Sequence, residues 1–157
     1  MLSAHSGGGG WIVEICDLAT GAQSKVAAQI IVNAAGPWVD LVIGKIAKRR
    51  EARHIRLVQG SHIVVKKLFD HDRCYVFQNL DGRIIFAIPY EEDFTLIGTT
   101  DRDFSGDPAK VVITPAETAY LCDAVSAYFE RAVTPMDVVW SFSGVRPLFD
   151  DHVSAAQ

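Results

Sequence analysis

Three short segments of the chain combine polar side chains and glycine with neighbouring apolar runs, and each could carry chemistry. The first is Asn33-Ala34-Ala35-Gly36-Pro37-Trp38, which follows the apolar residues 30–32. We interpret residues 30–33 as a buried strand that leads into a helix at Pro37. Because small side chains leave the backbone accessible, this strand end is a candidate surface for a flat or phosphorylated cofactor.

The other two segments are Gly60-Ser61-His62 and Ser143-Gly144-Val145-Arg146-Pro147. Glycine and proline restrict the backbone around Arg146, so its guanidinium could be held toward a carboxylate or phosphate. The alternative is a surface arginine paired with Asp150 or Asp151. His62, with an ordinary pKa of about 6.5, suits a proton acceptor or a hydrogen-bond donor to an alcohol, although a histidine beside a strand is commonly structural.

The segment Thr99-Thr100-Asp101 follows Gly98 at the end of a predicted strand. Its hydroxyl groups could line the same cavity as His62, or they could cap a turn. The sequence offers no GxSxG or HExxH motif and no paired Cys and His ligands, so hydrolysis is not favoured and no metal site is predicted. The glycines at 7–10 lack the spacing of a dinucleotide fingerprint, and we predict a loop there.

Composition narrows the class of protein. The 157 residues are 49% hydrophobic and 22% charged, which is typical of a globular protein. The net charge of -4 argues against broad attraction to nucleic acid or anionic lipid. Three widely spaced cysteines favour neither a disulfide framework nor a zinc site and fit a reducing compartment. Without an apolar run of spanning length or a signal peptide, we expect a cytoplasmic location.

The elements that position these segments can be predicted from periodicity. Strand patterns at 11–17 and 25–33 flank Thr20-Gly21 and predict a hairpin. A helix is expected from Pro37, with Lys48-Arg49-Arg50 at its solvated end. After residue 55 an antiparallel meander is predicted, because short strand patterns separated by turn residues occur at 62–67, 74–78, 83–89 and 94–99.

A second helix is expected to cover this meander. Thr114, Pro115 and Glu117 form a capping-box pattern at its start, and apolar residues recur at four-residue spacing after it. Residues 138–145 return to strand character and lead to Arg146. Pro147 is expected to end the pairing of that strand.

Four segments together carry a resemblance to a known family: IIVNAAGPWVD, IRLVQGSHIVV, IIFAIPYEEDFTLIGTTD and WSFSGVRPL. In this order they resemble the middle portion of the flavin-dependent, respiratory glycerol-3-phosphate dehydrogenases, which belong to the amino-acid-oxidase-like flavoproteins. The resemblance implies an FAD enzyme that oxidises glycerol 3-phosphate to dihydroxyacetone phosphate and passes electrons to quinone. It also allows peripheral attachment of the complete enzyme to the cytoplasmic face of the inner membrane.

The fold implied by the resemblance is α+β, with an antiparallel substrate-domain sheet covered by helices and partial pieces of an α/β FAD-binding domain. Residues 1–50 would be a partial FAD-binding domain, 51–142 the substrate-binding domain, and 143–157 a return to the FAD-binding domain. By the same resemblance, His62, Thr99 and Arg146 would face the substrate. His62 would act on the hydroxyl proton, and Arg146 on the phosphate or the developing carbonyl oxygen. The residues implied to lie along FAD are Ala34, Ala35, Gly36 and Trp38.

The chain also departs from this family. The family opens with a dinucleotide fingerprint and closes with a Gly-Gly-Lys segment, and neither is present here. We therefore expect an internal fragment that alone binds FAD poorly and has no turnover. Two alternatives stay open: a flavin-dependent amino-acid or methylated-amine oxidase, in which Arg146 holds a carboxylate, and a non-catalytic β-sheet binding module.

Overall fold

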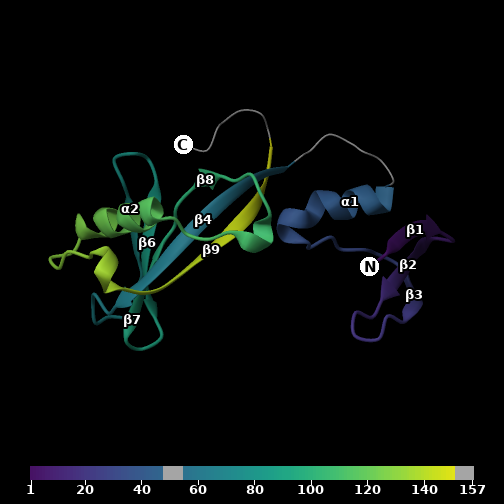
Figure 1. Cartoon of the computed structure of the whole chain (residues 1–157), viewed down its shortest axis with the longest axis horizontal. Helices are drawn as coiled ribbons and strands as arrows, with labels where there is room; N and C mark the ends of the chain where they lie inside the picture. The colour runs from purple at the N-terminus through teal and green to yellow at the C-terminus, as the bar shows by residue number, and fades with distance from the viewer. Residues whose placement is uncertain (48–54, 151–157) are drawn as a thin grey trace. The chain divides into compact units, whose positions relative to one another are not determined.

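The structure is a computed structural model that describes residues 1–47 and 55–150. The chain divides into two compact units, Met1–Ile55 and Arg56–Gln157 (Figure 1). The sequence places a boundary near the same position. The assignment of segments 1–50, 51–142 and 143–157 to cofactor and substrate domains stays a prediction.

The first unit contains a three-stranded antiparallel sheet, in the order β1 (Ser3–Gly7), β2 (Gly10–Cys16) and β3 (Gln23–Ala28). Gly8 and Gly9 have φ values of 62° and 85° and join β1 to β2. Two consecutive residues with positive φ are what a tight hairpin turn needs, and only glycine adopts them without strain. The four glycines are therefore part of a hairpin, and β1 is a strand that the sequence pattern did not reveal.

Residues 29–35 follow β3 without regular structure. Ile30 is 77% exposed and Val32 is 82% exposed, so the prediction of a buried strand at 30–33 is wrong for this chain. The physical reason is the lack of a partner, because no strand within residues 1–47 pairs with this segment. A short 3-10 helix, η1 (Gly36–Trp38), and then α1 (Val39–Ala47) follow. The predicted basic helix end at 48–50 lies outside the described residues.

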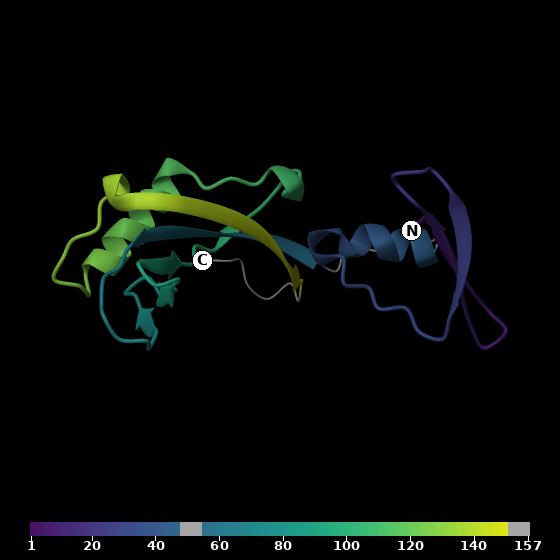
Figure 2. The same ribbon diagram turned by 90° about the horizontal axis from the view of Figure 1, so that it is seen from below.

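The second unit is built on a six-stranded sheet with the order β5-β6-β7-β4-β8, and β9 also pairs with β4. Neighbouring strands from β5 to β4 are antiparallel, as the predicted meander requires. In both views β9 runs alongside β4 (Figures 1 and 2). The strand bounds are β4 (Ile55–Lys66), β5 (Tyr75–Gln78), β6 (Ile84–Tyr90), β7 (Phe94–Gly98), β8 (Arg102–Asp103) and β9 (Val138–Phe149).

Helix α2 (Pro115–Ser126) covers one face of this sheet, and its predicted capping box is present. Thr114 Oγ1 accepts a hydrogen bond from the Glu117 N–H, and the Glu117 carboxylate accepts one from the Thr114 N–H. Each fully buried aliphatic side chain in the core contributes about 1.5–3 kcal/mol. The core consists of Ile63, Val65, Ile85, Ile97, Leu121, Cys122, Val125 and Val133.

The predicted α+β class, with an antiparallel sheet covered by a helix, is confirmed. One detail is wrong: β9 continues through Pro147 to Phe149. Among the described residues β9 pairs only with β4, and a strand with one free edge can accept a proline whose missing N–H faces away from its partner. Within residues 1–47 and 55–150, no helix is both long enough and apolar enough to cross a membrane.

Candidate functional site

The two faces of the sheet in the second unit have different surroundings. Alternate residues of a strand point to opposite faces. On β4, Ser61 and Ile63 are fully buried toward α2; on the other face His62 is only partly buried, between Val58 and Val64, which are buried. On β6, Ile85 is fully buried, whereas Phe86 is 37% exposed. We call the side away from α2 the open face; it includes Gly60, His62, Phe86, Ile88, Phe142, Gly144 and Arg146.

His62 is held on the open face by two neighbours. Its register partner on β7 is Gly98, and the ring lies where a Cβ on that glycine would have to sit. On β9, Phe142 stacks against the ring with a centroid separation of 4.8 Å and an interplanar angle of 4°. Among the described residues no group bonds to the buried Nδ1 of His62. The close fit against Gly98 and the stacking on Phe142 therefore fix the orientation of the imidazole.

The electrostatics of the site favour a neutral imidazole. Burial lowers the pKa of His62 below its ordinary value of 6.5, and the positive charge of Arg146 lowers this pKa further. A neutral imidazole can accept a proton near neutral pH. Arg146 lies close to His62 although it comes from a different strand, because its guanidinium lies over Gly60, two residues before His62 on β4.

Arg146 reaches across β4 at Gly60. A Cβ on Gly60 would overlap the Arg146 guanidinium and would lie only 2.8 Å from Thr99 Oγ1. The Nη2 atom of Arg146 donates to the Thr100 carbonyl at 2.9 Å and to the Asp101 carboxylate at 2.5 Å. Within residues 1–47 and 55–150, no acceptor bonds Nε or Nη1 of this guanidinium. Two of its nitrogens are therefore available to an anion.

Thr99 begins a bulge that brings these groups together. Gly98 pairs with His62, and Arg102 pairs with Gln59, so four steps along one strand match three steps along β4. One extra residue therefore lies in segment 99–101, which we call the bulge. Thr99 Oγ1 donates to the Thr100 carbonyl at 3.1 Å, which places it beside the guanidinium. The segment therefore forms a bulge, and whether its hydroxyl groups line a cavity stays a prediction.

Three contributions to this arrangement were missed from the sequence. Phe142 precedes Arg146 by four residues on the same strand, and this spacing could have placed both on one face. Asp101 pairs with Arg146, and the sequence pattern did not indicate it; of the two partners predicted, Asp151 lies outside the described residues. The sequence pattern indicates Gly98 only as a strand end, whereas in the structure its missing side chain provides the room for His62.

The predicted cofactor-contacting residues lie in the first unit. Asn33 bonds both sides of this segment, because its Nδ2 donates to the Val39 carbonyl at 3.0 Å and its Oδ1 accepts from the Ala35 N–H at 3.3 Å. Gly36 has a φ of 54° and open space around a would-be Cβ. Trp38 is 41% exposed. These properties leave backbone and an aromatic surface accessible, as contact with a flat cofactor requires.

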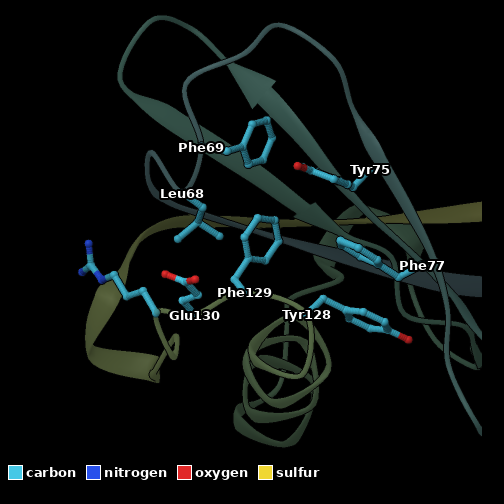
Figure 3. A pocket seen from close by; sticks show the side chains of 8 residues that line it. Leu68, Phe69, Tyr75, Phe77, Tyr128, Phe129 and Glu130 are labelled. Carbon is cyan, nitrogen blue, oxygen red and sulfur yellow. The ribbon is translucent and has the colours of Figure 1, made fainter.

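A separate hollow of about 370 Å³ lies beyond the end of α2 (Figure 3). Phe129 projects toward Phe69, Tyr75 and Phe77, with ring centroids 5.7, 5.5 and 5.8 Å away. Stacked and edge-to-face contacts at these distances are ordinary aromatic packing. The predicted site residues are not among its lining residues, so we assign the chemistry to the open face.

Comparison with known proteins agrees with the resemblance inferred from the sequence. The family model described as "FAD dependent oxidoreductase" matches residues 2–156. A glycerol-3-phosphate dehydrogenase of Pseudomonas aeruginosa is 47% identical over 151 residues, covering 96% of this chain and 29% of the relative. A D-erythritol 1-phosphate dehydrogenase of Brucella abortus is also 47% identical over 151 residues, covering 96% of this chain and 30% of the relative.

A solved structure gives the same result. The crystal structure of the glycerol-3-phosphate dehydrogenase from Bacillus halodurans complexed with FAD is 34% identical, with a TM-score of 0.73, over 90% of this chain and 28% of that chain. The chain thus spans about 29% of the length of the Pseudomonas relative that it matches. The predicted family is confirmed: the chain belongs to the FAD dependent oxidoreductase (DAO) family.

Proposed function

We propose that this chain is the substrate-facing part of a flavoenzyme that oxidises glycerol 3-phosphate to dihydroxyacetone phosphate. The observation that carries the proposal is the proximity of a neutral imidazole and a partly unpaired guanidinium on the open face. One group accepts a proton and the other binds an anion, and the oxidation of a phosphorylated alcohol needs both. The activity of the similar proteins supports the same substrate class.

The residues present fit an FAD cofactor. The small side chains and accessible backbone at Ala34, Ala35 and Gly36, together with the exposed Trp38, are suited to lie along it. When bound, FAD supplies the acceptor for the hydride from the alcohol carbon. The open face carries exposed apolar side chains such as Phe86 and Ile88, which can exclude water from a reacting group covered on its other side.

The residues of the chain supply the remaining functions. His62 takes the hydroxyl proton onto a ring nitrogen, while its stacking on Phe142 keeps the ring in one orientation. Arg146 binds the phosphate, or the developing carbonyl oxygen, through the nitrogens that Thr100 and Asp101 leave available. Thr99 Oγ1 lies beside the guanidinium and can bond the same ligand.

A second candidate substrate is D-erythritol 1-phosphate, because a relative with this activity has the same 47% identity to the chain. Both compounds carry a phosphate and secondary alcohols, so the same two groups would serve. The alternative of an amino-acid or methylated-amine oxidase uses Arg146 for a carboxylate. We further propose quinone as the electron acceptor, and peripheral attachment at the cytoplasmic face of the inner membrane; both follow from the resemblance alone.

The test is substrate choice by the full-length protein that carries this chain. Dye reduction is measured with glycerol 3-phosphate, D-erythritol 1-phosphate, sarcosine and D-alanine. We expect turnover with a polyol phosphate, and turnover with only sarcosine or D-alanine contradicts the proposal. Arg146→Lys is expected to raise the KM for the phosphorylated substrate, since an ammonium cannot reproduce the guanidinium fork. Arg131→Lys is the control, because Arg131 also pairs with an aspartate, Asp137.

The isolated chain provides a second test. The cofactor-contacting segment and the open face account for only part of a flavin site. We expect purified residues 1–157 to show no flavin absorbance band and no dye reduction. A yellow preparation that reduces dye with glycerol 3-phosphate contradicts this expectation.

A further inference from the structure

We propose that Glu117, on α2 behind the sheet, is a positioning residue that sets the place of Arg146 on the open face. The inference rests on the proposed function for its kinetic consequence. It requires that Glu117 acts through the bulge, because Glu117 and Arg146 lie on opposite sides of the sheet.

The Glu117 carboxylate does more than cap a helix. It is 7% exposed and accepts five hydrogen bonds. Its Oε2 accepts from the N–H and hydroxyl of Thr114, which is the ordinary capping box, and from Gln59. Its Oε1 instead accepts from Ser61 Oγ at 2.8 Å and Thr100 Oγ1 at 2.9 Å. A capping box needs only one of these oxygens, so the bonds of Oε1 have another purpose.

Thr100 connects the two sides of the sheet. Behind the sheet, its hydroxyl donates to Glu117 and accepts from the Ser61 N–H at 2.9 Å. In front, its carbonyl accepts from Arg146 Nη2 at 2.9 Å and from Thr99 Oγ1 at 3.1 Å. A displacement of this one residue therefore moves the acceptor that holds the guanidinium.

The bulge explains why Thr100 needs hydrogen bonds from outside the regular strand ladder. An extra residue disrupts the regular ladder, so backbone groups next to it need other partners. Here the Thr100 hydroxyl takes the place of a ladder acceptor for the Ser61 N–H. Because that hydroxyl accepts from Ser61, its own proton must point elsewhere, and the carboxylate of Glu117 receives it. The carboxylate thereby fixes Thr100 relative to β4.

Glu117 is ionised at neutral pH. Burial raises the pKa of its carboxyl, but the hydrogen bonds from Ser61, Thr114 and Thr100 together hold the pKa below its ordinary value of 4.5. A carboxylate can accept bonds at both oxygens, whereas an amide offers only one accepting oxygen. Glu117→Gln therefore keeps the shape and must lose acceptors on one side of the carboxylate.

The test uses the full-length flavoenzyme that carries this chain. Glu117→Gln and Thr100→Val are each expected to raise the KM for glycerol 3-phosphate about tenfold with kcat changed less than about threefold, since a misplacement of about 1 Å can cost up to about 100-fold. Thr100→Ser, which keeps the hydroxyl, is expected to bring the KM back toward the wild-type value. Asp137→Asn is the matched control, because Asp137 accepts from the N–H and hydroxyl of Thr134 in another capping box.

The outcomes separate the inference from the proposed function. A wild-type enzyme without turnover of a polyol phosphate contradicts the function, and the KM for whichever substrate it oxidises then serves for the comparison. A Glu117→Gln enzyme that loses thermal stability as Asp137→Asn does, but keeps the wild-type KM, overturns the inference. A crystal structure of Glu117→Gln gives a readout independent of activity. We expect a displaced guanidinium, and an Arg146 still bonded to the Thr100 carbonyl overturns the inference.

Discussion

The two faces of the six-stranded sheet are made by the same strands and satisfy their polar groups in opposite ways. On the side of α2, Ile97 and Leu121 are fully buried, and the buried carboxylate of Glu117 is bonded at both oxygens. On the open face, the Nδ1 of His62 has no partner among the described residues, and Arg146 is bonded through one nitrogen. Buried polar groups normally find partners, so within the described residues the polar groups of the open face are less fully satisfied than those of the covered face.

Residues of the covered face and residues of the open face alternate along the same strand. Ser61 and His62 are consecutive on β4, yet one bonds Glu117 behind the sheet and the other stacks on Phe142 in front. The covered face depends on side chains that fill space. The open face depends on side chains that are missing, because Gly60 and Gly98 make room for Arg146 and His62. Substitutions on the two faces should therefore separate stability from catalysis.

The largest effect is expected at His62. His62→Ala in the full-length enzyme removes the proposed proton acceptor and should lower kcat by about 10²–10⁴-fold. His71→Ala is the control, because its imidazole is also partly buried but bonds Tyr75 OH at 2.8 Å, away from the open face. Steady-state kinetics with glycerol 3-phosphate measure both. Equal kcat losses in the two variants would remove the distinction between the faces.

The next effect concerns stability on the covered face. Leu121 is fully buried in the core, so Leu121→Ala should lower the free energy of unfolding by about 2–5 kcal/mol. Ile88 on the open face is 37% exposed, and Ile88→Ala should cost clearly less. Urea unfolding of residues 1–157 measures both changes. A larger loss for Ile88→Ala would show that the open face is part of the core.

The covered face could be predicted from the sequence because its signals are local. A helix start is predicted within four residues by Thr114, Pro115 and Glu117. Short strand patterns with intervening turns predict the meander. The helix start and strands β5, β6 and β7 lie within a few residues of their expected bounds, whereas β4 begins at Ile55, seven residues before the strand predicted at 62–67. The prediction of a buried strand at 30–33 is wrong for a different reason. Its burial depends on partners that residues 1–47 do not provide.

The open face was only partly predictable. His62, Thr99 and Arg146 were identified as candidates from residue type and resemblance, and the structure brings all three near Gly60. Their partners were not identified. The contacts of Asp101 and Phe142 depend on the one-residue bulge and on which edge of β4 receives β9, and neither can be read from spacing. Whether these residues act on a substrate stays a prediction.

A smaller kinetic effect should follow from filling the space over β4. Gly60→Ala places a methyl group where the guanidinium of Arg146 lies, and it should raise the KM for glycerol 3-phosphate about tenfold, or about 1.4 kcal/mol. Gly144→Ala is the matched control on the same face, since no described atom lies within 4 Å of its would-be Cβ. Steady-state kinetics give the KM of the Gly60→Ala and Gly144→Ala enzymes for comparison. An unchanged KM for Gly60→Ala would mean that Arg146 does not bind the anion.

The smallest effect is the pH dependence of stability, and it also distinguishes the two faces. The pKa of His62 is lowered in the folded state by burial and by Arg146, so below pH 6.5 the unfolded state binds the proton more readily. The free energy of unfolding should therefore fall as the pH drops through this range, by at most about 1.4 kcal/mol per pH unit for one proton. The lowered pKa of Glu117 acts in the same direction, but only as the pH falls below its ordinary value of 4.5.

Urea unfolding of wild type, His62→Ala and Glu117→Gln between pH 3.5 and 7 separates these contributions. His62→Ala should reduce the loss of stability that begins as the pH falls below 6.5. It should leave unchanged the further loss that Glu117 contributes below pH 4.5. Glu117→Gln should reduce the slope of only the more acidic part, because Glu117 is one of the carboxylates whose lowered pKa contributes to stability there. If His62→Ala and wild type give parallel profiles between pH 5 and 7, the imidazole is not kept neutral by its position on the open face.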